Sequence, residues 1–230
     1  MKRFVSLLFI VLLAFFDYNM YVLKSRGVIL LPKIKDELEQ AKKYENKIQI
    51  TDIAIKKVRY IEYKDLTNAQ NVIMQRLAKE VLFLSQTFND SNEVAITCDL
   101  ALSNPLENYG ICLGDEHSVD VCSDTQSNHL IVSAKMCTVV ILHNHPSLQT
   151  FSLDDIRFFV ANRGISILVV VSNQGKVHYL YKDKKYSERE TIQLFNECIE
   201  GLDRSSAVSE RYHRALAFLA RCSETGLFYS

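Results

Sequence analysis

Two histidines and an aspartate stand at a spacing that could hold a metal ion. His143 and His145 close the apolar run TVVILHNHP, and Asp155 follows His145 by ten residues. Residues two apart in an extended chain point to the same side, so both imidazoles can face one point at the end of a strand. The loop that follows is long enough to return the carboxylate to that point. Two imidazoles and one carboxylate leave a fourth position for water, which is the donor set of catalytic zinc.

Hydrolysis at such a site needs a base for the proton of the water and a donor that stabilises the developing oxyanion. Ser152, three residues before Asp155, is placed for the second role because its hydroxyl can donate a hydrogen bond. Ser152 and Asp155 also have the spacing of a helix capping box, and two histidines before a proline can be an ordinary turn. The capping and catalytic roles are compatible, because a capping side chain is held rigidly.

The stretch His143-Asn-His-Pro-Ser147, followed by Ser152-Leu-Asp-Asp155, resembles the E…H-x-H…S-x-x-D signature of the JAMM/MPN+ (JAB) metallopeptidases. It is most similar to their RadC-like bacterial branch, and the resemblance covers about residues 92–182. The family usually has seven residues between the second histidine and the serine, whereas this chain has six. The resemblance implies zinc bound by His143, His145 and Asp155, and hydrolysis of peptide or isopeptide bonds. It also implies a JAB/MPN fold, which is similar to that of cytidine deaminases.

The general base of this family is a glutamate on an early strand of the sheet. Glu93 lies fifty residues before His143 and opens the apolar stretch EVAITCDL, as the family pattern requires. The resemblance therefore implies that Glu93 accepts and returns the proton. Glu107, which is followed by an apolar strand of its own, is the alternative base, and Glu116 is a third candidate.

The pattern of apolar residues predicts an α/β (α+β) mixed sheet flanked by helices. Thr67 and Gln70 form a capping box for a long helix with its apolar stripe at Leu66, Ala69, Val72, Ile73, Leu77, Val81 and Leu84. The alternation predicts strands within residues 47–63 and at 93–100, 109–114, 118–121 and 138–142, and a hairpin at 165–181 with its turn at 173–175. Residues 129–137 can be helix or strand. Further helices are expected at 153–162, with Gly164 as a C-cap candidate, and from 187 to about 222.

We divide the chain into four segments. Residues 1–19 are a hydrophobic leader, which fits an export signal, a weak anchor, or an artefact of start-site choice with Met20 as the true start. Residues 20–91 are an N-terminal segment with strands and a long helix, 92–186 are the RadC-like domain, and 187–230 are a C-terminal helical segment. The cytoplasm is the expected compartment, and a genuine leader would change this to a membrane-anchored or exported protein.

Charge and cysteine usage narrow the classes of function. The 27 basic and 27 acidic residues cancel, so the bulk charge predicts no nucleic-acid partner. Six cysteines without a CxxC pair fit reduced core thiols. We expect a protein or peptide substrate, while the sequence predicts no oligomeric state. The alternatives are a non-catalytic JAB-fold binding module, and a RadC-like protein associated with DNA repair or mobile elements.

Overall fold

The computed structural model describes residues 47–134, 137–203 and 206–230. The chain divides into two compact units, Met1–Asp36 and Glu37–Ser230, and every described residue belongs to the second unit. The predicted leader at residues 1–19 lies outside the described residues. Within the described ranges, none of the helices combines the length and the hydropathy that a membrane span requires.

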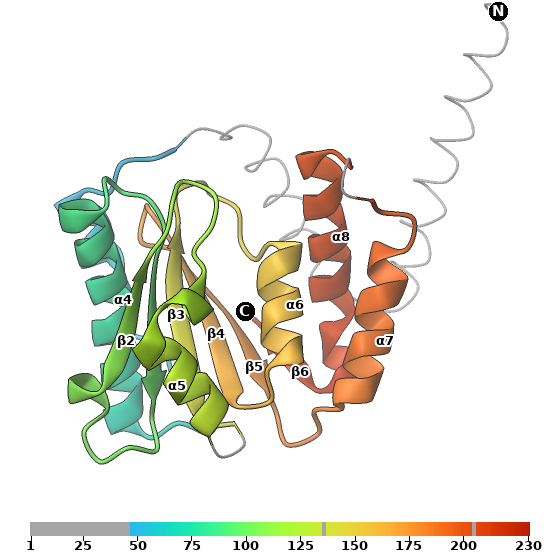
Figure 1. Cartoon of the computed structure of the whole chain (residues 1–230), viewed down its shortest axis with the longest axis horizontal. Coiled ribbons are helices and arrows are strands. Elements are labelled where there is room, and N and C mark those ends of the chain that lie inside the picture. The colour runs from blue at the N-terminus through green and yellow to red at the C-terminus, as the bar shows by residue number, and fades with distance from the viewer. Residues whose placement is uncertain (1–46, 135–136, 204–205) are drawn as a thin grey trace, which may run out of the picture. The chain divides into compact units, whose positions relative to one another are not determined.

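A six-stranded mixed sheet forms the centre of the second unit (Figure 1). Its strands lie in the order β2-β1-β3-β4-β5-β6, with β3 parallel to β4 and all other neighbours antiparallel. The strands are β1 (Val94–Asp99), β2 (Tyr109–Leu113), β3 (Val139–His145), β4 (Ile165–Ser172), β5 (Val177–Lys182) and β6 (Leu227–Tyr229). The predicted α/β class is confirmed, as is the predicted hairpin of β4 and β5, whose turn contains Gly175 in the left-handed region at φ 83°.

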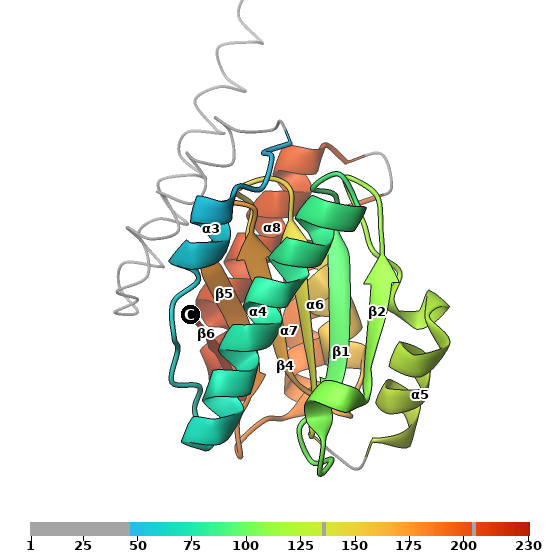
Figure 2. The same ribbon diagram turned by 90° about the vertical axis from the view of Figure 1, so that its left-hand side faces the viewer.

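Helices cover both faces of this sheet (Figures 1 and 2). One face carries α4 (Asn68–Phe88), with the short α3 (Asp52–Lys57) beside it. The other face carries α5 (Thr125–Ser133), α6 (Leu153–Ala161) and α8 (Val208–Arg221), and α7 (Glu188–Ile199) packs against α6 and α8. Three short 3-10 helices complete the described elements: η1 (Pro105–Glu107), η2 (Val121–Ser123) and η3 (Cys222–Thr225).

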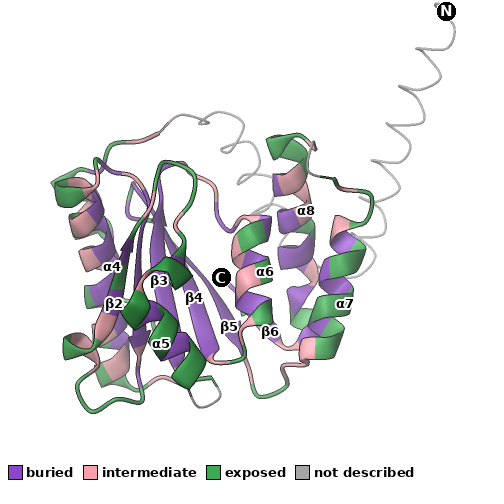
Figure 3. Ribbon diagram, in the orientation of Figure 1, coloured by how far each residue is buried: buried purple, intermediate pink, exposed green. Residues whose placement is uncertain are grey.

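The two central strands, β3 and β4, form the middle of the core and are buried along their whole length (Figure 3). Alternation along β3 sends Val140 and Leu142 into the cluster under α4, so Ile141 and His143 face the other layer. A parallel pair covered on both faces is apolar throughout, as the run TVVIL predicts. The apolar pattern ends at His143 and His145. Both histidines belong to β3 itself, whereas the sequence pattern predicts them after the strand.

Helix α4 confirms the Thr67–Gln70 capping box, in which Gln70 N donates to the Thr67 hydroxyl and Thr67 N donates to Gln70 Oε1. Its buried face is rotated from the predicted stripe. Leu77 and Val81 are buried as expected, whereas Ala69 and Val72 face solvent. The contact with the sheet runs instead through Asn71, Met74, Leu77, Ala78, Val81, Leu82 and Ser85.

Several other local predictions are wrong. Residues 47–63 contain no strand; Thr51 caps α3 there by accepting a hydrogen bond from Ala54 N, and this local cap outweighs the alternation of apolar residues. The predicted strand at 118–121 is a loop that leads into η2. The C-cap of α6 is Asn162 rather than Gly164. Of residues 129–137, where the sequence allows helix or strand, 129–133 belong to helix α5. The C-terminal segment holds two helices and adds β6 to the sheet.

All six cysteines are free, and four of them are buried.

Candidate metal centre

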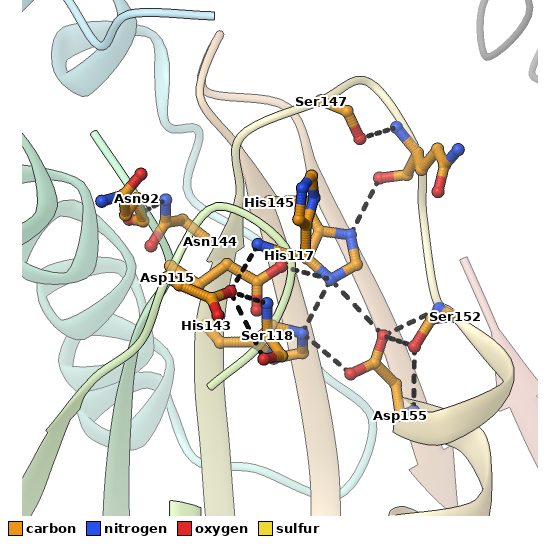
Figure 4. Close-up of polar contacts among 12 residues, drawn as sticks. Asn92, Asp115, His117, Ser118, His143, Asn144, His145, Ser147, Ser152 and Asp155 are labelled. Atoms are coloured by element: carbon orange, nitrogen blue, oxygen red, sulfur yellow. Dashed lines mark hydrogen bonds and ion pairs between the residues drawn. The ribbon is translucent and has the colours of Figure 1, made fainter. Parts of the chain in front are cut away.

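Three predicted ligands converge at the end of β3 (Figure 4). The two imidazoles approach each other with 3.0 Å between their Nε2 atoms. Asp155 bridges them, with Oδ1 3.2 Å from His143 Nε2 and Oδ2 3.4 Å from His145 Nε2. His143 and His145 are buried, and Asp155 is partly exposed. Among the described residues, these three form the group whose ligand atoms could hold a metal ion.

The spacing of these atoms fits a small divalent cation. Ligands at about 2.0–2.1 Å from a tetrahedral zinc ion lie roughly 3.3 Å from one another. The two imidazole nitrogens are 3.0 Å apart, and each lies 3.2 or 3.4 Å from one of the two oxygens of Asp155, so these separations lie around this value. Two imidazoles and one carboxylate also suit several first-row divalent metals, so the donor set defines a metal site and leaves the metal to be identified.

Neighbouring groups orient both kinds of ligand. The Nδ1 atom of His145 lies 3.2 Å from the carbonyl oxygen of Gln149, so this nitrogen is the natural donor and Nε2 is left toward the aspartate. Asp155 is held by Ser152, whose backbone N–H and hydroxyl both donate to Asp155 Oδ2 at 2.7 Å. Asp155 N in turn donates to the Ser152 hydroxyl at 3.1 Å, which completes the predicted capping box of α6.

Ser152 therefore has a structural task in addition to its predicted chemical one. Its hydroxyl hydrogen points to Asp155 in the structure, and its oxygen accepts from the first turn of α6. The side chain lines the same cleft as the two imidazoles. A role in binding the oxyanion requires this hydroxyl to turn from Asp155 toward the substrate, and it stays a prediction.

The structure brings one of the three candidate glutamates to the imidazoles. Glu93 precedes β1 and is buried, with Oε1 3.9 Å from His145 Nε2. The antiparallel pairing of β1 with β3 explains this, because Ala95 lies opposite His143. Glu107 is exposed in η1, at the opposite end of β1 and β2, and accepts a hydrogen bond from Asn104. Glu116 is exposed on the loop after β2 and lines the cleft.

Burial and mutual attraction set the charges of the site. Burial raises the pKa of Glu93, and this outweighs the opposing attraction of His145 and His143. Burial alone would lower the pKa of His145, but the hydrogen bond to Asp155 and the charges of Glu93 and Asp155 raise it to about 9. Burial opposes ionisation of Asp155 too, yet the two histidines hold the pKa of its carboxyl well below the usual range. The Asp155 carboxylate and a protonated His145 thus stabilise each other without metal, and a divalent cation bound here would take the place of that proton.

A cleft of about 860 Å³ opens over the three ligands and Glu93. Ile141 and Leu168 of the central strands contribute apolar floor. One wall is the loop at residues 116–121, and another is the beginning of α8 at residues 207–209. Sequence reasoning missed both walls, because no local pattern tells which distant segments border the end of β3. It also missed Asn144, the residue between the histidines, although the alternation of a strand places it on the opposite face.

We compared the chain with family models, curated proteins and solved structures, and no match was found in any of the three comparisons.

Proposed function

We propose that the protein is a zinc-dependent hydrolase of the JAMM/MPN+ (JAB) type, closest to the RadC-like branch, that cleaves peptide or isopeptide bonds. One observation carries this proposal. His143, His145 and Asp155 meet within hydrogen-bond distance of one another, and the buried Glu93 carboxylate lies 3.9 Å from His145 at the base of an open cleft. A JAB/MPN architecture, with a mixed sheet between helical layers, is part of the same proposal.

Each residue has a defined task in this reaction. His143, His145 and Asp155 would hold zinc, a Lewis acid that lowers the pKa of bound water toward neutrality. Glu93 accepts the proton of the attacking water as the C–O bond forms, and it returns that proton to the nitrogen as the C–N bond breaks. Its raised pKa suits a group that must both take and give a proton near neutral pH. Ser152 donates a hydrogen bond to the carbonyl oxygen as that oxygen gains charge.

The test combines metal analysis with a cleavage screen on the full chain. We expect about one zinc per chain and cleavage of peptide or isopeptide substrates that stops with a chelator and returns with zinc. Glu93→Gln keeps the shape of the side chain and removes the base, so it should retain zinc and lose turnover by about 10²- to 10⁴-fold. His145→Ala should lose zinc as well as turnover, because it removes a ligand.

Glu107→Gln is the matched control for the base. Glu107 lies far from the imidazoles, so this substitution should leave both zinc content and turnover unchanged. Full activity in Glu93→Gln together with a dead Glu107→Gln would overturn the assignment of the base. A protein that binds zinc and cleaves nothing would instead be the non-catalytic binding module.

A further inference from the structure

Asn144 lies on the face of β3 opposite to the two imidazoles and is fully buried (Figure 4). Its Oδ1 atom accepts a hydrogen bond from Val94 N at 2.7 Å. Its Nδ2 group donates to the carbonyl oxygen of Asn92 at 3.0 Å. Asn92 and Val94 are the two neighbours of Glu93 in the chain, so one amide group holds the backbone on both sides of the candidate base.

The hydrogen bonds of the Asn144 side chain take the place of backbone pairing between β1 and β3. The pairing of β1 with β3 ends at Ala95 and His143, one step before Val94 and Asn144 would meet. Beyond that point Glu93 is paired with the other neighbour, since Glu93 N donates to Asp115 O and Gly114 N donates to Glu93 O. The Asn144 side chain is therefore what ties the start of β1 to the end of β3, where the imidazoles lie.

The orientation of the amide is fixed by further contacts. Nδ2 also lies 3.1 Å from the Ser85 hydroxyl and 2.8 Å from Asn173 Oδ1. Asn173 in turn donates to the carbonyl oxygens of Ile48 and Ser91. A flipped amide would place its hydrogens against Val94 N–H, so the network permits one orientation. A fully satisfied buried network of this kind holds its members rigidly.

We propose that Asn144 is a positioning residue for Glu93, which fixes the carboxylate relative to the imidazoles. The inference rests on the role of Glu93 in the proposed function. It assigns two tasks to the stretch His143-Asn144-His145: one face presents two metal ligands, and the other face sets the place of the base. Asp115, Gly114 and Asn89 hold the Glu93 backbone from the other side, and Asn144 is the side chain that ties it to the strand that carries the ligands.

The test uses Asn144→Ala in the zinc-loaded full chain. We expect kcat to fall by about 10- to 100-fold, with KM and zinc stoichiometry unchanged, because Glu93 loses its place while the ligands remain. Asn173→Ala is the matched control. It removes a buried amide from the same network and loses the contacts to Ile48, Ser91 and Asn144 Nδ2. The bonds from Asn144 to Asn92 and Val94 and the contact with Ser85 remain. It should lower thermal stability and keep kcat.

A double-mutant cycle separates positioning from general damage. In the Glu93→Gln background the base is already absent, so adding Asn144→Ala should cause no further loss of turnover. The same loss in both backgrounds, or a parallel loss of zinc, would overturn the proposal. If Asn144→Ala does not fold, Asn144→Ser keeps an uncharged polar side chain at this position that is too short to bond both Asn92 and Val94, and it should show a loss of kcat in the same direction. An unchanged kcat in that variant would also count against the proposal.

A structural measurement tests the positioning role of Asn144 without an activity assay. Crystal structures of the wild type and the two alanine variants give the separation of Glu93 Oε1 and His145 Nε2, which is 3.9 Å here. It should lengthen or spread over several positions in Asn144→Ala and stay unchanged in Asn173→Ala. An unchanged separation in Asn144→Ala refutes the positioning role. Absence of hydrolysis by the wild type, by contrast, refutes the proposed function and leaves this measurement standing.

Discussion

At the scale of single residues, alternation along β3 separates the two candidate metal ligands from Asn144, the proposed positioning residue. His143 and His145 share one face, and Asn144 occupies the other. Ser152 has a comparable double position, because its hydroxyl caps α6 and also lies in the cleft. Its capping role is seen in the structure, and its role as a donor to the oxyanion stays a prediction.

Ser152→Ala separates the two tasks of this serine. Loss of the cap should lower the free energy of unfolding by about 1 kcal/mol. Loss of the oxyanion donor should lower kcat by about 10²-fold or more, with KM and zinc stoichiometry retained. Urea unfolding, metal analysis and steady-state kinetics measure the three quantities. Ser152→Thr, which keeps the hydroxyl, is the control and should behave as the wild type. A fall in zinc content that parallels the loss of activity would mean that the hydroxyl acts only by orienting Asp155.

The convergence of the three candidate ligands could be predicted from sequence because their spacings are local. H-x-H in a strand and S-x-x-D at a helix start each place their side chains without knowledge of the rest of the fold. Glu93 needed the resemblance to a family as well, since fifty residues separate it from His143. Asn144 could not be assigned a role, because its partners Asn92 and Val94 become neighbours only once β1 lies beside β3.

At the scale of elements, α6 must stay in place for Asp155 to reach the imidazoles. The far end of this helix is held by Lys182 of β5, which is buried. Its Nζ donates to the carbonyl oxygens of Phe159 at 2.8 Å and Asn162 at 2.7 Å. These are carbonyls at the end of the helix, which lack partners within it. Burial lowers the pKa of Lys182 to about 8, and a neutral amine still has two hydrogens for the two carbonyls.

Lys182→Met tests this arrangement through pH. The pKa of Lys182 is lower in the folded chain than the ordinary 10.5, so between pH 8 and pH 10.5 the unfolded chain binds the extra proton. The folded wild type therefore gains stability relative to Lys182→Met as pH rises through this range, by on the order of 3 kcal/mol. Urea unfolding of both proteins across the range gives the difference, in which other titrating groups cancel. A constant difference would mean that Lys182 titrates normally.

Elements with a strong local signal were predictable, and those decided by their surroundings were not. The capping boxes of α4 and α6 and the turn at Gly175 each depend on a few adjacent residues. β6 has only three residues, Leu227–Tyr229, and exists because it pairs with β5. The predicted strand at 118–121 has the right residues but no neighbouring strand to pair with, so it forms the wall of the cleft instead.

At the scale of the whole molecule, the charge is balanced but its distribution is not. The chain has 27 basic and 27 acidic residues. Along the cleft, however, the described ionisable side chains other than histidine are one lysine and five carboxyl groups, namely Lys47, Glu93, Glu116, Asp120, Asp154 and Asp155. A bound divalent cation would offset two of these charges. Asp154 is also paired with Arg157 and Arg211. The exposed carboxylates of Glu116 and Asp120 on the wall of the cleft are therefore the groups that disfavour a phosphate backbone there.

This distribution predicts that the full chain does not bind duplex DNA through its cleft. At physiological salt we expect any dissociation constant to be weaker than about 10⁻⁴ M, the weak limit of ordinary non-specific binding. Fluorescence anisotropy with labelled duplex, measured over a series of salt concentrations, gives both the affinity and its salt dependence. A variant with Glu116→Lys and Asp120→Lys is the positive control. Both side chains are exposed, so the fold should persist while the wall of the cleft gains four units of charge and some salt-dependent binding. Tight binding by the wild type, falling steeply with salt, would instead favour the nucleic-acid role of the RadC-like alternative, because only phosphate contacts release counterions in this way.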